Sequence, residues 1–267
     1  MMRSPRALFD FRAALSEEVR AAISEFDSSD GRPKAVHRCR VRLKRARALA
    51  RVGRNGAPGL SAVFEDSAQA VMACLSHERD LTALSEAALD LSKRSRKRAA
   101  AALESIAGVI DAERALVKKI DPETVRTALK DLLALAQVWP EPSERQISRG
   151  AKHVIRRARK SFKRGVGAPD PVLRHDWRKR EKARFYASLL LEHSFPAKRR
   201  RKRGERLGHV LGQERDALLL LDRLDANPAM TGSPSGADAA RKALHRELAK
   251  RARRADKLGA RLHADGA

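Results

Sequence analysis

Two short segments of the chain place histidine, arginine and lysine at the same spacing. Residues 36–44 read VHRCRVRLK and residues 174–182 read RHDWRKREK, so both contain the pattern H-x-x-R-x-R-x-K. Arginine offers a planar fork of donors to an oxyanion, lysine a point charge, and histidine a donor whose charge changes near neutral pH. The residue types therefore suit the binding of phosphate-like anions.

On a helix that turns 100° per residue, the first pattern becomes a stripe on one face. A stripe roughly 80° wide contains His37, Arg40, Lys44, Arg47 and Arg51. The adjoining, core-facing sector contains Val36, Cys39, Leu43, Ala46 and Ala50, whereas Arg38, Arg42 and Arg45 point elsewhere and are expected to be solvated. In the second pattern His175, Arg178, Lys179 and Lys182 share a face, with Tyr186 one turn further along.

A solvated basic face is the usual explanation for one such stripe, but the repeat favours an anion-binding groove. Like charges three and four residues apart destabilise a helix, and a merely solvated face has no reason to repeat the same residues in register. The two histidines lack a ligand at i+3 or i+4 that would favour a metal, and no nucleophile accompanies them for acid–base catalysis. We interpret them as donors at a phosphate site.

A second motif, L-x-x-E-R-D, follows each basic segment, at residues 75–80 and 211–216. His37 precedes Asp80 by 43 residues and His175 precedes Asp216 by 41, so two motifs recur in one order. Both E-R-D segments are expected within apolar helices. Their residues Arg79, Asp80, Arg215 and Asp216 either orient basic side chains, which we favour together with Tyr186, or form an acid pair for a metal. Further cations that could contact an anion are Arg156, Arg159, Lys202 and Arg206.

The fold that must position these residues is predicted to be all-α. Apolar residues recur every three or four positions with no useful β-type alternation, which indicates about nine helices separated at clusters of Gly and Pro. Asp121, Ser143 and Asp170 are expected to cap helices that begin at the next residue. Long helices with short turns indicate antiparallel bundles, and the repeat predicts two related halves, 1–139 and 140–267.

Composition narrows the class of partner. The 267 residues include 58 Lys plus Arg against 33 Asp plus Glu, a net charge of +25, which points to a polyanion. No stretch approaches the roughly 20 apolar residues of a membrane span, and acids interrupt the N-terminal segment where a signal peptide would be apolar. Two cysteines make no disulfide framework or zinc site, so we expect a cytoplasmic protein.

The motifs resemble those of the CHAD family, the conserved-histidine α-helical domain. Residues 36–47 fit its first signature, residues 175–182 fit H-D-W-R-K-R-x-K, and Leu211, Gly212 and Asp216 fit L-G-x-x-x-D. The sequence departs from the family at Ser76, where a Gly is usual, and at Arg184, one position before the usual second Arg.

The resemblance implies two pseudo-two-fold-related helical bundles around a central basic channel that binds inorganic polyphosphate. His37, Arg40, Lys44 and Arg47 would line the channel from one half, and His175, Arg178, Lys179 and Lys182 from the other. It implies a binding module without catalysis, cofactor or metal, with polyphosphate-metabolising enzymes as candidate partners and polyphosphate granules as a candidate location.

Two other functions stay open at this stage. Charge alone would suit a protein that binds nucleic acid non-specifically, although no zinc finger, RNA-recognition motif or basic zipper is present. A polyphosphate or triphosphate phosphohydrolase, or an accessory to one, is disfavoured because no P-loop and no carboxylate cluster for Mg²⁺ is found.

Overall fold

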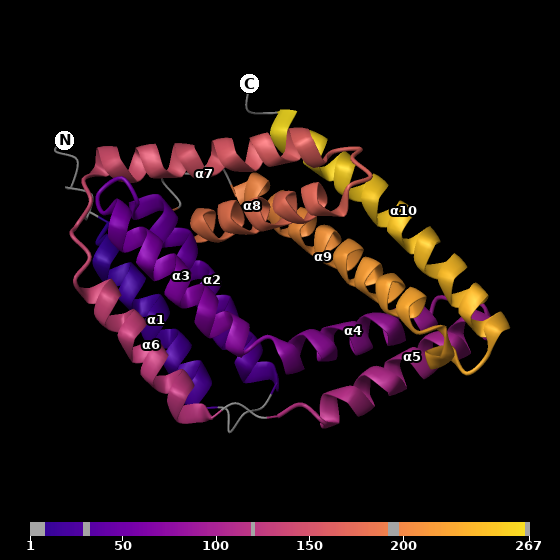
Figure 1. Ribbon diagram of the computed structural model, residues 1–267. Helices are drawn as coiled ribbons and strands as arrows, with labels where there is room; N and C mark the ends of the chain where they lie inside the picture. Colours follow the sequence, from indigo (N-terminus) through magenta and orange to yellow (C-terminus); the bar gives the residue numbers. More distant parts are fainter. Residues whose placement is uncertain (1–8, 29–32, 119–120, 192–197, 265–267) are drawn as a thin grey trace. The chain divides into compact units, whose positions relative to one another are not determined.

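The chain is entirely helical in the part that the structure describes. The computed structural model describes residues 9–28, 33–118, 121–191 and 198–264, which form ten α-helices and one short 3₁₀-helix and contain no strand (Figure 1). The all-α prediction is confirmed, with one helix more than expected. The α-helices are α1 (Phe11–Asp27), α2 (Pro33–Gly53), α3 (Pro58–Cys74), α4 (His77–Ser92), α5 (Lys97–Ala115), α6 (Pro122–Gln137), α7 (Glu144–Gly165), α8 (Pro171–Leu190), α9 (Lys198–Ala226) and α10 (Pro234–Ala264).

The three predicted helix starts are confirmed by their caps. The Asp121 carboxylate accepts from the Glu123 and Thr124 backbone N–H groups at 3.2 and 3.0 Å, with Pro122 in the first turn of α6. Ser143 and Gln146 bond reciprocally at the start of α7, and Asp170 Oδ1 accepts from the Val172 N–H at the start of α8. Each cap satisfies donors that the first turn leaves unpaired.

Two helix breaks contain neither glycine nor proline and were not predicted. Leu75 and Ser76 separate α3 from α4, and residues 93–96 separate α4 from α5. The first E-R-D segment therefore lies in the first turn of α4, whereas the second lies in the middle of α9. Both segments lie within helices, as predicted. Ser76 falls in this break.

The described helices group into two compact units. The first unit contains α1, α2, α3 and α6, and the second contains α4, α5, α9 and α10. The division passes through α7 after Val154 and through α8 after Phe185. It follows spatial packing, whereas the predicted halves 1–139 and 140–267 follow the repeat, so those halves stay a prediction.

Three aromatic rings form the centre of the first unit. Trp139 is fully buried, and its ring centroid lies 5.9 Å from that of Phe11 and 6.0 Å from that of Phe64. The Glu141 carboxylate accepts from the Phe11 and Arg12 backbone N–H groups, so the segment after α6 holds the start of α1. Helix α1 packs against α2 and α6, which places α2 along one side of this core.

Paired helices build the core of the second unit. Helix α4 packs against α5 and α9 against α10, and α5 also packs against α10. A continuous apolar cluster joins them, with Leu81, Leu103, Ile106 and Leu220 almost completely buried. A smaller cluster around Trp177 seats the first part of α8 on α9 and α10.

Candidate functional site

The stripe predicted on α2 is present as a half-buried row beside the core of the first unit. His37 is exposed, and Arg40, Lys44, Arg47 and Arg51 are half-buried. On the adjoining face the predicted core residues Cys39, Leu43, Ala46 and Ala50 are buried, and Val36 is half-buried. The apolar side of α2 thus fixes which cations lie along its edge.

Helix α3 holds the C-terminal end of this stripe. Arg51 Nε donates to Glu65 Oε2 at 2.7 Å, and Arg47 Nη2 donates to Gln69 Oε1 at 3.0 Å. Burial and the nearby Arg51 charge lower the pKa of Arg47. The end of the stripe is therefore oriented by neighbouring side chains rather than left mobile in solvent.

The prediction that Arg38, Arg42 and Arg45 are merely solvated is wrong. Arg38 pairs with Glu25, and Arg42 and Arg45 pair with Glu18 at 3.3 and 2.7 Å. Both acids are on α1, which packs against α2 and brings its carboxylates to this side of the helix. These three arginines join α1 to α2, and sequence periodicity could not show it because the acids come from another helix.

The second stripe lies on the part of α8 that belongs to the second unit. His175, Arg178 and Lys182 are half-buried and Lys179 is exposed. Their neighbour Trp177 is fully buried, with its ring centroid 5.3 Å from that of Phe162 on α7. Trp177 therefore sets the rotation of α8 and hence the direction of the stripe.

A buried arginine next to His175 anchors the start of α8. Arg174 Nη2 donates to Glu214 at 2.7 Å, Nε donates to the same carboxylate, and Nη1 donates to Asp256 at 2.6 Å. Its Nη1 also donates to the Gly165 carbonyl at 2.9 Å, and its guanidinium lies 5.2 Å from the Trp177 ring centre. Arg174 thus ties α8 to α7, α9 and α10. Sequence reasoning missed it because its partners are distant in the chain.

Positive neighbours dominate the electrostatics of the α8 stripe. Burial, the largest cause, acts together with the charges of Lys179, Arg215 and Arg178 to lower the pKa of His175 to about 4, against the weaker opposite effect of Asp176. Burial and Arg178 also lower the pKa of Lys182, and Glu205 only partly offsets this. The part of these shifts that comes from surrounding cations would be reversed by an anion placed beside them.

The two E-R-D segments come together in the second unit. Burial raises the pKa of Asp216, while Arg178, Arg79 and Arg215 lower it and Asp80 raises it, so these charges from α4, α8 and α9 lie within electrostatic reach. Asp216 is within electrostatic reach of Arg178, as an orienting carboxylate would be. Its role in orienting Arg178 stays a prediction.

The remaining predicted residues are more scattered. Arg156 is exposed and Arg159 half-buried on α7, and Lys202 and Arg206 are exposed near the start of α9. Tyr186 is buried and lies in the part of α8 that belongs to the first unit. The stripes of α2 and α8 belong to different units.

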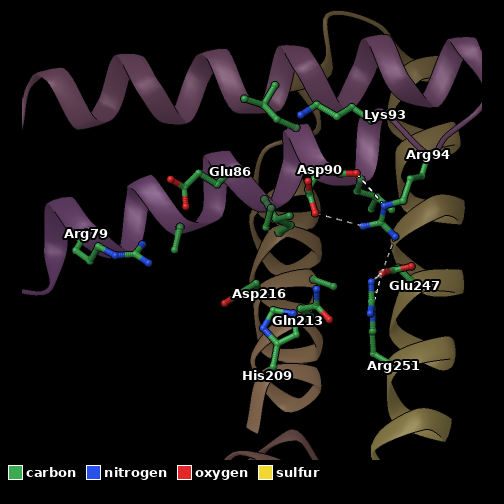
Figure 2. A pocket seen from close by; sticks show the side chains of 16 residues that line it. Arg79, Glu86, Asp90, Lys93, Arg94, His209, Gln213, Asp216, Glu247 and Arg251 are labelled. Carbon is green, nitrogen blue, oxygen red and sulfur yellow. Dashed lines mark hydrogen bonds and ion pairs between the residues drawn. The ribbon is translucent and has the colours of Figure 1, made fainter. Parts of the chain in front are cut away.

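Two cavities open on the second unit, and their charges differ. One of about 510 Å³ lies between α4, α9 and α10 (Figure 2). Acids and bases are balanced there, and Arg94 bonds to Glu247 at 3.2 Å while Glu247 also holds Arg251. The other, about 250 Å³, is lined by His175, Arg178 and Arg215 at the start of α8. Only the second suits an anion.

Among the described residues no three His, Cys, Asp or Glu side chains are arranged to hold a metal ion. In the same part of the chain no helix combines the length and the apolar character needed to cross a bilayer.

Comparison with known proteins defines the class. The CHAD domain family model matches residues 13–225, so this chain belongs to the CHAD family. The fold is similar to the crystal structure of the CHAD domain from the plant Ricinus communis, with a TM-score of 0.60 and 21% sequence identity over 95% of this chain and 90% of that chain. A search of curated proteins found no match to this chain.

Proposed function

We propose that this protein binds inorganic polyphosphate without catalysis, through the basic stripes of α2 and α8. The supporting observation is the half-buried row His175, Arg178 and Lys182, where burial and, after it, positive neighbours lower the pKa values of the histidine and the lysine. A phosphate chain would add negative charge beside these basic side chains. Membership in the CHAD family supports this ligand, and the channel between two related halves is part of the same proposal.

The burial of both tryptophans and of the tyrosine favours polyphosphate over single-stranded nucleic acid. Trp139 and Trp177 are fully buried, and Tyr186 is 8% exposed, so no Trp or Tyr of the chain is available as a platform for bases. Proteins that bind single strands depend on such stacking in addition to charge. A ligand that consists of phosphates alone needs only the cations.

The proposal is tested by calorimetric titration with long-chain polyphosphate and, at equal phosphate concentration and moderate salt, with single-stranded DNA. We expect polyphosphate to bind at least tenfold more tightly. Equal affinities would contradict polyphosphate as the specific ligand and would favour the nucleic-acid alternative.

A matched pair of variants tests the site itself. The double variant Lys44→Gln/Lys182→Gln should weaken polyphosphate binding by about tenfold or more, because each lysine would contact phosphate. The control Lys130→Gln/Lys250→Gln removes the same charge from exposed positions on α6 and α10 and should change affinity by less than about twofold. Equal losses in the two variants would mean that net charge, rather than the stripes, binds the ligand.

A further inference from the structure

Three glycines follow one another at four-residue intervals on α9. Gly204, Gly208 and Gly212 share one face of the helix, and Asp216 continues the series. Glycine is less favourable in a helix interior than any residue except proline, because it loses the most backbone freedom on folding. Three of them within one 29-residue helix call for a packing reason.

Each glycine lies beneath one cation of α8. A Cβ added at Gly208 would lie 3.3 Å from Cε and 3.4 Å from Cδ of Lys182. A Cβ added at Gly212 would lie 3.7 Å from Nε of Arg178. The lysine is in tight contact with its glycine, and the arginine is at ordinary van der Waals distance.

The third contact continues the series and shows its direction. A Cβ added at Gly204 would lie 2.5 Å from Nη2 of Arg184. The glycine positions rise from 204 to 212 while the positions of the cations that they contact fall from 184 to 178. The two helices therefore run antiparallel along this contact. Arg184 differs from the other two because its Nε donates to the buried Glu181 at 2.8 Å, so its charge is already compensated.

We infer that Gly208 and Gly212 are positioning residues for polyphosphate binding, which keep Lys182 and Arg178 extended across α9 with their charged ends at fixed places. This inference rests on the proposed function. Without a Cβ the helix surface is flat at these two turns, so the long side chains lie against it. The ordering of the two side chains is then complete before the ligand arrives.

Two other observations agree with this role. Lys182 is half-buried, and burial is the largest cause of its lowered pKa, as expected for an ammonium group held against protein rather than extended into water. Arg178 Nε is buried without a hydrogen-bond partner, so its orientation is set by packing on Gly212 and by the nearby charge of Asp216. Packing on the glycines thus contributes to the orientation of both side chains.

The test compares Gly208→Ala with Gly108→Ala. An added methyl group at Gly108, on α5, meets nothing within 4 Å, and both changes improve helix propensity. We expect Gly108→Ala to bind polyphosphate like the wild type. Gly208→Ala should bind about two- to tenfold more weakly, because Lys182 must then be ordered on binding. Gly212→Ala, with its looser contact, should show a smaller loss. Equal affinities of Gly208→Ala and Gly108→Ala would overturn the inference.

A double-mutant cycle separates positioning from a general structural effect. If Gly208 acts through Lys182, Gly208→Ala should have no further effect on affinity in a Lys182→Met background. The same loss in both backgrounds would show that the alanine disturbs α9 itself, and would overturn the inference.

A ligand-free measurement keeps this inference distinct from the proposed function. Absence of polyphosphate binding by the wild type would refute the function alone. The pKa of Lys182, followed by NMR of ¹³C-labelled lysine side chains, should rise toward its ordinary value in Gly208→Ala, because the displaced ammonium group reaches solvent. An unchanged pKa would overturn the positioning role.

Discussion

At the scale of single residues, the α8 stripe is a row of basic side chains in which the charges around the histidine are mostly positive. His175 has its pKa lowered to about 4, mainly by burial and then by three positive neighbours. It is therefore neutral at pH 7, and its buried Nδ1 has no hydrogen-bond partner. A phosphate chain along the row would reverse the electrostatic part of this effect. The state of His175 consequently reports whether an anion is bound.

We predict that polyphosphate raises the pKa of His175 and that affinity increases as the pH falls from 7.5 to 5.5. Binding is then coupled to proton uptake, which changes affinity by at most about tenfold per pH unit for one proton. NMR titration of the His175 ring with and without ligand measures the pKa, and calorimetry at the two pH values measures the affinity. His175→Gln should reduce the pH dependence. An unchanged pKa in the complex would contradict an anion beside His175.

The free protein should show the opposite response to acid. The pKa of His175 in the folded state, about 4, is below the ordinary value of 6.5. At a pH between these two values, the unfolded chain therefore binds a proton at His175 that the folded chain does not bind. His175 therefore contributes a loss of stability as the pH falls through that window. Bound polyphosphate should diminish this contribution.

At the scale of elements, close helix contacts fix where the stripes point. In the first unit a Cβ added at Gly150 of α7 would overlap the carbonyl oxygen of Val52 on α2, so the two backbones touch at this turn. The contact holds the start of α7 against the end of α2. In the second unit the ring contacts of Trp177 and the hydrogen bonds of Arg174 hold α8 in place. The cations depend on these contacts for their direction.

We predict that Gly150→Ala destabilises the protein by about 1–3 kcal/mol, because the backbones of α2 and α7 must separate to admit the methyl group. Gly108→Ala should instead stabilise it by up to about 1 kcal/mol through helix propensity. Urea denaturation of the two variants provides the measurement. A neutral Gly150→Ala would show that α7 moves away from α2 at little cost.

At the scale of the whole molecule, the net charge of +25 attracts any polyanion. Only part of this charge is arranged in the stripes of α2 and α8. Many of the remaining arginines have structural partners, as Arg42 and Arg45 do with Glu18, so net charge overstates the cations available to a ligand. The specific contribution must come from cations whose positions are fixed. The general charge adds attraction that salt screens.

We predict that saturating polyphosphate stabilises the whole chain against unfolding. At a free ligand concentration of one hundred times Kd, the free energy of unfolding should rise by about 2.7 kcal/mol. The gain should shrink steeply with salt, since log Kd varies with log salt in proportion to the number of phosphates contacted. Differential scanning fluorimetry across a salt series measures both effects. A melting temperature that does not respond to ligand at low salt would contradict binding to the folded state.

The sequence by itself determined the helical fold, the capped helix starts and the faces of α2. These are local properties: the 3.6-residue period, the cap residues Asp121, Ser143 and Asp170, and the composition of one helix face depend on neighbours in the chain. The repeat and the family motifs likewise followed from residue identity and spacing.

Tertiary structure decided which charges are already compensated and which are held in place. Arg38 and Arg42 were expected to be solvated because their acidic partners are on another helix, α1. Arg174 was not predicted to matter because its partners Glu214 and Asp256 are far along the chain. The glycines of α9 can be explained only by the cations of α8 that pack on them. Ion pairing and close packing depend on distance in space, and the sequence gives no direct measure of that distance for residues on different helices.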